Sequence, residues 1–569
     1  MTRFLLRSAL VVLAALQLVP PRDANAQASK PVEPTPAPLP LKYTGKTTGA
    51  AITPADLMTR LYIFADDSMT GRKAGTVGGL KATAYIEREV RRLGLKPAGD
   101  SGTYFMKVPL VRRVLDPASS LRVDTATLKL GTDVFAALSG TGPVRPIEGK
   151  QIIYGGTPSD TATFIKPDQA ADKLILITGS ARGLSRRLPE AAGFIVPILD
   201  QQIPLVRAQL ADPPTVLQTD EPTSTSRATI YVPLSKVPQL LGIPLDSVRP
   251  GSLGKVVHGE LKFTYPEAPA RNVVAIIPGS DPKLRNQYVA IGAHNDHLGI
   301  RRSGPVDTDS LHEYNKLYER AYVAQTGKGT EYPGSGLSRE EAAAIKVNVD
   351  SLHRLRPARL DSIYNGADDD GSGSVGVLEI AEWFAKTPVK PKRSIIFVWH
   401  TGEELGLFGS EYFTDHPTVP RDSIVAQLNV DMIGRGGAPD VPGGGPNYVE
   451  LIGSRRLSTE LGDLVEQVNK TKGYNMKFDY AFDATGHPEQ IYCRSDHYEY
   501  ARYGIPITFF TTGGHSDYHQ LTDEPQYIDY AHLAKISRFI GDVALSVANL
   551  DHRVVVDKPK PDPKGTCVQ

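Results

Sequence analysis

The sequence predicts an α/β fold: a mixed, mostly parallel sheet with helices on both faces, plus an inserted, mostly β domain. Two observations predict it. From Arg271 onward, short apolar runs alternate with stretches whose apolar residues recur at helical spacing, which is the pattern of βαβ units. Between residues 115 and 265, short β-rich runs are broken instead by clusters of Gly, Pro, Ser and Thr.

Composition excludes several classes of protein. The chain has 569 residues with 64 basic and 63 acidic side chains, so its net charge is +1 and it offers no general basic face for nucleic acid. Hydrophobic residues make up 40%, which excludes a disordered chain. The two cysteines, Cys493 and Cys567, are too few for a disulfide scaffold or a Cys-rich zinc module. A pairing between them and two free thiols remain equally open.

The N-terminus predicts export. Arg3 and Arg7 flank a short apolar run that ends in Ala24-Asn25-Ala26, which is typical of a cleaved signal peptide over residues 1–26. A retained anchor is the alternative, although the run is short for a membrane span. No later segment reads as a membrane span. We therefore expect a secreted or periplasmic protein, with a Pro-rich linker over residues 27–41.

The elements follow in order along the chain. Helices are expected from Thr53, a cap-like residue, and over residues 81–95, within an N-terminal part of the main domain at 42–114. The inserted domain occupies 115–265, with strands expected at 173–178, 193–199 and 228–234. The main domain resumes over 266–550, with strands at 273–277, 288–293, 394–399, 426–430 and 507–510 and helices at 374–386 and 457–470. A polar, partly helical insertion interrupts it at about 304–360, and residues 551–569 are expected to form a flexible tail.

Polar clusters follow four of these strands. They are His294 to His297, His400 to Glu404, Asp431, and Gly513 to His519, and a fifth cluster, Asp368 to Asp370, precedes a helix. The carboxyl ends of strands line the ligand crevice of open α/β sheets, so these clusters can converge. Two histidines among three carboxylates suit zinc, with two ions sharing one carboxylate. Taken singly, each has a plainer reading: the three aspartates could cap the helix, for example.

The motifs AHNDHLG, NGADDDGSG, TGEELGLFGS, NVDMIGR and DYH resemble, in order and type, those of the di-zinc aminopeptidase family, peptidase family M28. The resemblance implies a zinc exopeptidase-like fold, two zinc ions, and peptide or protein substrates. It implies that His294 and Asp431 hold one ion, that Glu404 and His519 hold the other, and that Asp369 bridges them. It also implies that Glu403 is the general base and that the Asp296 carboxylate orients the His294 imidazole. The segment 115–265 resembles a protease-associated domain.

Alternatives remain at this point. A carboxypeptidase of the same family would need a cationic pocket, for which Arg435 and Arg494 are candidates. A glutaminyl cyclase and a catalytically silent, receptor-like binding protein are further readings. His515 is the rival of His519 as a ligand, whereas the family pattern does not use His297, His400 or His497. The 304–360 insertion is either a lid over the site or a distant surface excursion.

Overall fold

The computed structural model describes residues 39–139, 143–181, 183–210, 212–218, 225–327, 329, 336–388 and 390–569. The predicted signal peptide and residues 27–38 of the predicted linker lie outside these ranges. Within the described residues, no helix combines the length and the apolar character needed to cross a bilayer.

A ten-stranded mixed sheet forms the centre of the main domain, in the order β10-β2-β14-β20-β15-β21-β24-β22-β23, with β1 beside β14. The four central strands, β20, β15, β21 and β24, form one parallel block, and antiparallel pairs flank it on both sides. At the far edge of the sheet, β22 and β23 are again parallel to each other. The strands are β1 (Lys96–Pro97), β2 (Phe105–Arg112), β10 (Thr215–Leu217), β14 (Glu267–Ile277), β15 (Tyr288–His294), β20 (Ser394–His400), β21 (Ile424–Val430), β22 (Tyr448–Ile452), β23 (Lys477–Asp479) and β24 (Ile507–Thr511).

The sequence explains why the parallel block is central. Every residue of β20, β21 and β24 is buried, so these strands must be covered on both faces, as their near-continuous apolar runs predict. The expected mixed sheet is confirmed, with a parallel block at its centre.

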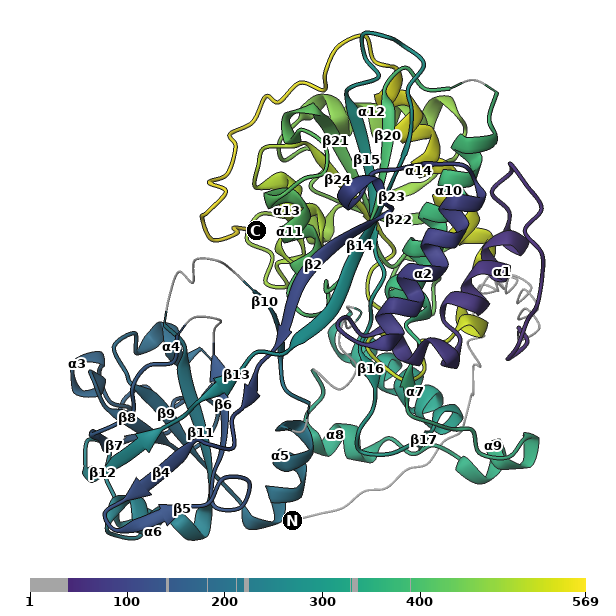
Figure 1. Ribbon diagram of the computed structural model, residues 1–569. Coiled ribbons are helices and arrows are strands. Elements are labelled where there is room, and N and C mark those ends of the chain that lie inside the picture. Colours follow the sequence, from purple (N-terminus) through teal and green to yellow (C-terminus); the bar gives the residue numbers. More distant parts are fainter. Residues whose placement is uncertain are drawn as a thin grey trace, which may run out of the picture. The chain divides into compact units, whose positions relative to one another are not determined.

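Helices cover both faces, as predicted (Figure 1). One group packs together against one face: α1 (Pro54–Phe64), α2 (Val77–Arg92), α10 (Gly373–Lys386), α12 (Thr459–Thr471) and α14 (Tyr530–Asn549). The second group, α11 (Phe408–Asp415) and α13 (His497–Ala501), contacts the strands from another side. Thr53 caps α1 as expected, because its side chain accepts a hydrogen bond from the backbone N–H of Asp56.

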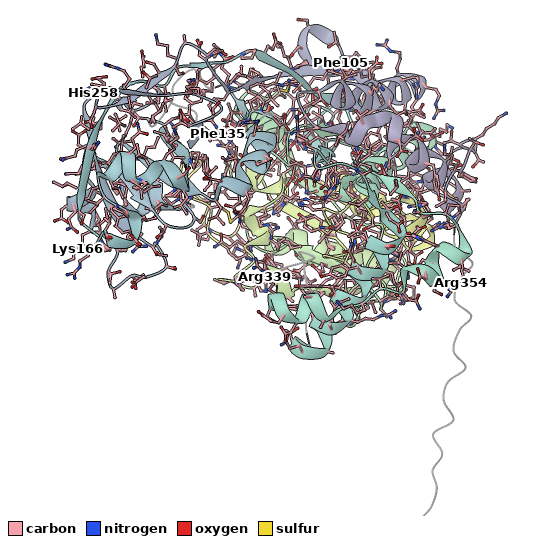
Figure 2. All side chains as sticks on the ribbon, turned by 90° about the horizontal axis from the view of Figure 1, so that it is seen from below. Phe105, Phe135, Lys166, His258, Arg339 and Arg354 are labelled. Atoms are coloured by element: carbon pink, nitrogen blue, oxygen red, sulfur yellow. A yellow bond between two sulfur atoms is a disulfide. The ribbon has the colours of Figure 1, made fainter. Side chains whose placement is uncertain are left out.

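The segment expected to form the inserted domain builds a second, eight-stranded sheet, in the order β5-β4-β12-β7-β8-β9-β11-β6. Two residues of this segment, Lys166 and His258, are labelled in Figure 2. Its strands are β4 (Ser120–Val123), β5 (Ala126–Leu128), β6 (Phe135–Ser139), β7 (Lys150–Gly156), β8 (Leu174–Ile177), β9 (Gly193–Ile198), β11 (Arg227–Pro233) and β12 (Leu253–Glu260). Four short helices accompany them: α3 (Pro167–Ala170), α4 (Leu184–Arg187), α5 (Ile203–Leu210) and α6 (Val237–Leu241).

Two connections tie this segment to the main sheet. β3 (Val114–Leu115) and β13 (Phe263–Thr264) pair with each other where the chain leaves and returns. Between them, β10 crosses back and pairs with β2 in the main sheet. β10 was not predicted from the sequence, because it is only three residues long and nothing in its composition marks the crossing.

The 304–360 insertion is helical: α7 (Thr308–Thr326), α8 (Arg339–Ala344) and α9 (Val349–Leu355). Its ends are closed by two short ribbons, β17 (Val306–Asp307) with β18 (Leu360–Asp361) and β16 (Gly299–Ile300) with β19 (Ile363–Tyr364). Helix α7 contacts the loop that carries His519. His312 stacks on Tyr527 with ring centroids 3.8 Å apart, and Asn315 donates a hydrogen bond to Thr522.

The last segment, residues 551–569, forms no helix or strand, yet it is joined to the main domain. Cys567 forms a disulfide with Cys493, so the pairing left open by the sequence is present. Gln569 accepts a hydrogen bond from the backbone of Tyr492 and donates two to carbonyls of Phe482 and Ala484. These contacts hold the end of the segment, which the sequence analysis expected to be flexible.

Candidate metal centre

The central strands bring the predicted residues together. His294 is the last residue of β15, Asp431 follows β21, Glu403 and Glu404 follow β20, and His519 lies in the loop after β24. Asp369 lies in the turn Ala367–Ser372 that precedes α10. The strand ends therefore meet at one edge of the sheet, as expected for an open α/β fold.

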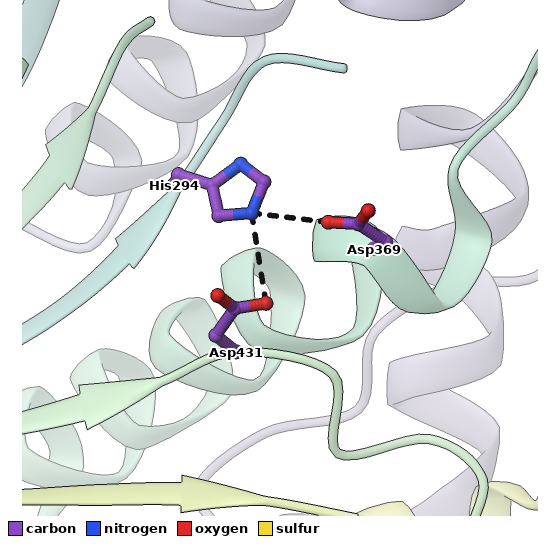
Figure 3. A group of neighbouring side chains, drawn as sticks. All are labelled: His294, Asp369 and Asp431. Carbon is purple, nitrogen blue, oxygen red and sulfur yellow. Dashed lines mark ion pairs between the residues drawn. The ribbon is translucent and has the colours of Figure 1, made fainter. Parts of the chain in front are cut away.

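Two groups of side chains could hold metal ions. In the first, His294 Nε2 lies 3.1 Å from Asp369 Oδ1 and 3.6 Å from Asp431 Oδ1 (Figure 3). In the second, His519 Nε2 lies 3.0 Å from Asp369 Oδ2 and 3.1 Å from Glu404 Oε2. Asp369 thus presents one oxygen to each group, as a carboxylate between two ions would.

The three consecutive aspartates have different interaction partners. Asp370 accepts hydrogen bonds from the backbone N–H groups of His294, Gly373 and Met432, so it joins three segments, one of which is the start of α10. Asp368 accepts from the backbone of Gly434 and lies 3.2 Å from His515 Nε2. Of the three aspartates, only Asp369 faces the two histidines of the metal groups.

His515 has another environment than His519. It is fully buried beside Asp368, and its Nδ1 accepts a hydrogen bond from the backbone of Asp517. His519 instead faces Asp369 and Glu404, with its backbone in the left-handed region at φ 57°. The imidazoles of His294 and His519 outweigh the effect of burial and hold the pKa of Asp369 well below its usual range.

Asp296 contacts the site through both its main chain and its side chain. His294 Nδ1 lies 3.1 Å from the backbone carbonyl of Asp296 and 3.8 Å from its Oδ1. The carboxylate also accepts a hydrogen bond of 3.2 Å from the backbone N–H of Glu403. Asp296 therefore lies beside the imidazole of His294 and also contacts the segment that carries Glu403.

Glu403 lies beside the first group, with its Oε2 3.9 Å from His294 Nε2. Burial raises the pKa of Glu403 well above its usual range, and repulsion from Glu404 and Asp431 adds to the effect. A carboxylate in this environment accepts a proton readily, and bound cations would offset part of the shift.

A line of polar side chains, which was not predicted from the sequence, runs along β21 into the site. Gln427, Asn429 and Asp431 alternate along the strand and so point to one face. Gln427 donates to Asn429, Asn429 donates to Ser495 Oγ at 3.0 Å, and Ser495 donates to Asp431 Oδ2 at 2.8 Å. The signal was the polar alternation within AQLNVD, an exception in an otherwise apolar strand.

Arg72, from the segment between α1 and α2, is a second feature that the sequence did not reveal. It is fully buried and donates hydrogen bonds to the backbone carbonyls of Asn295 and Gly366. It thereby joins the loop after β15 to the turn that carries Asp369. Burial lowers the pKa of Arg72 to about 10, and nearby carboxylates, Asp523 first, work against this.

The two candidate arginines differ in position. Arg435 is buried between Asp440 and Asp517, which neutralise it. Arg494 lines a cavity of about 70 Å³ beside Asp369 and Glu403. The wall of this cavity also includes Phe482, Ile491, Phe509 and the buried carboxylate of Glu450. Only Arg494 of the two therefore lies where a substrate could meet it.

The donor set fits metal ions. His294 Nε2, Asp369 Oδ2, Glu404 Oε1 and Asp431 Oδ1 are all buried and have no hydrogen-bond partner within the part of the chain that the structure describes. Buried polar atoms are normally satisfied, and cations bound among these donors would satisfy them. Imidazole and carboxylate donors without cysteine suit zinc.

Part of the chain is similar to known peptidases. Residues 341–544 match the model of peptidase family M28. The chain is 27% identical over 219 residues to leucine aminopeptidase 1 of Aspergillus fumigatus, covering 37% of this chain and 53% of that protein. It is 41% identical over 80 residues to leupeptin-inactivating enzyme 1 of Streptomyces exfoliatus, covering 14% and 18% of the two. The chain thus spans about half, or less, of the length of these curated relatives.

Solved structures give a weaker likeness. The zinc aminopeptidase of Bacillus subtilis superposes with a TM-score of 0.48 at 14% identity, covering 87% of this chain and 95% of that one. The aminopeptidase of Aneurinibacillus sp. strain AM-1 gives a TM-score of 0.47 at 15% identity, covering 90% and 97%.

Proposed function

We propose that the protein is a zinc-dependent aminopeptidase, and the match of residues 341–544 to the model of peptidase family M28 supports this. Two zinc ions are held by His294 and Asp431 at position one and by Glu404 and His519 at position two, with Asp369 between them. The observation that carries the proposal is the set of buried donor atoms that face one another without hydrogen-bond partners among the described residues.

Charge supports two ions. The proposed ligands include three carboxylates, and the carboxylates of Glu403 and Asp296 lie close by. An uncompensated cluster of buried negative charge is costly, and two divalent cations would bring the centre close to neutrality.

The chemistry is hydrolysis of a terminal peptide bond. Zinc bound here would supply Lewis acidity and lower the pKa of an attacking water. Glu403 takes the proton of that water and passes it to the leaving amine, acting first as base and then as acid. The backbone N–H of Glu403, held by the Asp296 carboxylate, keeps this side chain beside the ligands.

The cavity beside the centre is proposed to receive the terminal residue of the substrate. Glu450 in its wall can attract a free amino group, which favours an aminopeptidase. Arg494 in the same wall can attract a terminal carboxylate, which is the observation that favours the carboxypeptidase alternative.

We also propose that the protein works outside the cytoplasm. The predicted signal peptide supports export, and so does the disulfide between Cys493 and Cys567, since such bonds persist in oxidising compartments.

The test uses the full chain with zinc and matched peptides whose N-termini are free or acetylated, with mass spectrometry to record which end shortens. Loss of residues from the amino end, only when it is free, is expected. Loss from the carboxyl end would instead establish the carboxypeptidase. Glu403→Gln is the control variant: it should keep its zinc and lose roughly 10²- to 10⁴-fold in turnover, because proton transfer is removed. Near-normal turnover with zinc present would remove Glu403 from the role.

A further inference from the structure

His297 lies at the centre although the family pattern gives it no part. It follows His294 by three residues in the loop after β15, and its side chain is fully buried. Its Nδ1 lies 2.7 Å from Glu404 Oε1 and 3.7 Å from Asp369 Oδ2. Together with Asp369 and Glu404 of the second group, His297 places donor atoms close enough to surround an ion.

The short distance to Glu404 is not a hydrogen bond. Neither ring nitrogen of His297, nor Glu404 Oε1, has a hydrogen-bond partner of acceptable geometry among the described residues. A nitrogen and an oxygen 2.7 Å apart that do not point at each other can instead point at a common third atom. An imidazole orienting Glu404 from behind would show the aligned hydrogen bond that is missing here.

The ring is also held in place from its other side. The backbone of Gly366 packs against it so closely that a Cβ there would lie 2.5 Å from Cδ2 and Cγ of His297. The ring centroids of His297 and His519 lie 5.9 Å apart, and the two rings are in a T-shaped arrangement. The imidazole therefore has a defined orientation beside the donors of position two.

We propose that His297 is a fourth protein ligand at position two. The inference rests on the proposed two-zinc centre. Position two then has His297, Asp369, Glu404 and His519, which completes the tetrahedral set typical of zinc sites that hold their ion firmly. Position one has His294, Asp369 and Asp431, three protein donors and an open place, as in catalytic zinc sites.

The two positions should therefore differ in exchange. We expect position two to fill first and to release zinc at least about tenfold more slowly than position one, since it has one more protein donor. Removing His297 should make the rates of zinc release from the two positions similar.

The decisive measurement is zinc X-ray absorption on the full chain loaded with one equivalent, which counts imidazoles per ion without reference to peptide hydrolysis. The wild-type protein should show about two imidazoles per zinc and His297→Phe about one. His297→Phe keeps a ring against Gly366 without a nitrogen, and His258→Asn, on the second sheet, is the control that should match the wild type. Zinc retention in a chelator gives the exchange rates of the same samples.

One imidazole per zinc in the wild-type protein would overturn the proposal, whatever the variants do, so a variant that fails to fold does not leave it undecided. An unchanged count in a folded His297→Phe protein would overturn it as well. The proposed function fails separately: a protein with two imidazoles per zinc that hydrolyses no peptide would keep His297 as a ligand and refute the aminopeptidase.

Discussion

Ser495→Ala tests whether the polar line along β21 holds the metal ligand Asp431. The hydroxyl donates to Asp431 Oδ2 at 2.8 Å and accepts from Asn429, so its removal leaves the carboxylate without this donor and the amide of Asn429 without its acceptor. A hydrogen bond to a charged group contributes about 1.5–3 kcal/mol, which corresponds to roughly 10- to 150-fold in an equilibrium constant. Losses of about 10- to 100-fold are usual when a ligand's outer partner is removed.

The assay is a competitive titration with a zinc chelator, which gives the affinity of each position. We expect the weaker affinity to fall by roughly 10- to 100-fold in Ser495→Ala, while the tighter one, which lacks Asp431, changes little. Ser495→Thr keeps the hydroxyl and should restore most of the loss. A fall of less than about threefold in Ser495→Ala, with the fold intact, would refute the reasoning, because the hydrogen bond would then be worth less than its geometry implies.

Three further changes have defined outcomes. Asp369→Asn should bind less than one zinc per chain, measured by elemental analysis, because both positions lose a charged ligand; two retained ions would refute the bridge. Replacing both Cys493 and Cys567 by Ala opens a loop of 74 residues and should cost about 4 kcal/mol in the chain-entropy account, seen as a lower Tm; an unchanged Tm would contradict it. Arg60→Met leaves Glu379 buried without its cation and should cost about 3–5 kcal/mol. Burial already raises the pKa of Glu379 to about 7, so this loss should be largest above pH 7 and shrink below it as Glu379 is protonated; a pH-independent Tm difference would count against this account.

Much of the fold could be predicted because burial leaves a mark in the sequence. Strands covered on both faces read as nearly continuous apolar runs, and β20 is such a strand. The neighbours of each strand were beyond prediction, because strand order depends on contacts distant in sequence. For that reason the sequence did not predict β10, which is three residues long, or the antiparallel strands on both sides of the central parallel block.

The candidate centre, like the fold, could be predicted from the sequence only in part. The placement of polar residues after strands predicted that His294, Asp431 and His519 converge. The separate tasks of Asp368, Asp369 and Asp370 could not be predicted, because they are identical side chains whose roles depend on which backbone N–H groups they meet. The family pattern gives His297 no part, and only its distance to Glu404 in the folded chain shows that it lies beside the other donors.

The pairing of β2 with β14 has a consequence for how the chain folds. Val111 and Glu267 lie opposite each other in the register of the two strands, although 156 positions separate them in the sequence. Closing an unstructured loop of this length costs about 4 kcal/mol in chain entropy before any main-sheet contact forms. If the eight-stranded sheet assembles first, the pairing of β3 with β13 brings the two ends of the loop together. The entropy cost of closing the loop is then offset by contacts within a unit that has its own hydrophobic core. During synthesis the second sheet is complete before the central strands of the main sheet have been made, so the order of translation favours this route.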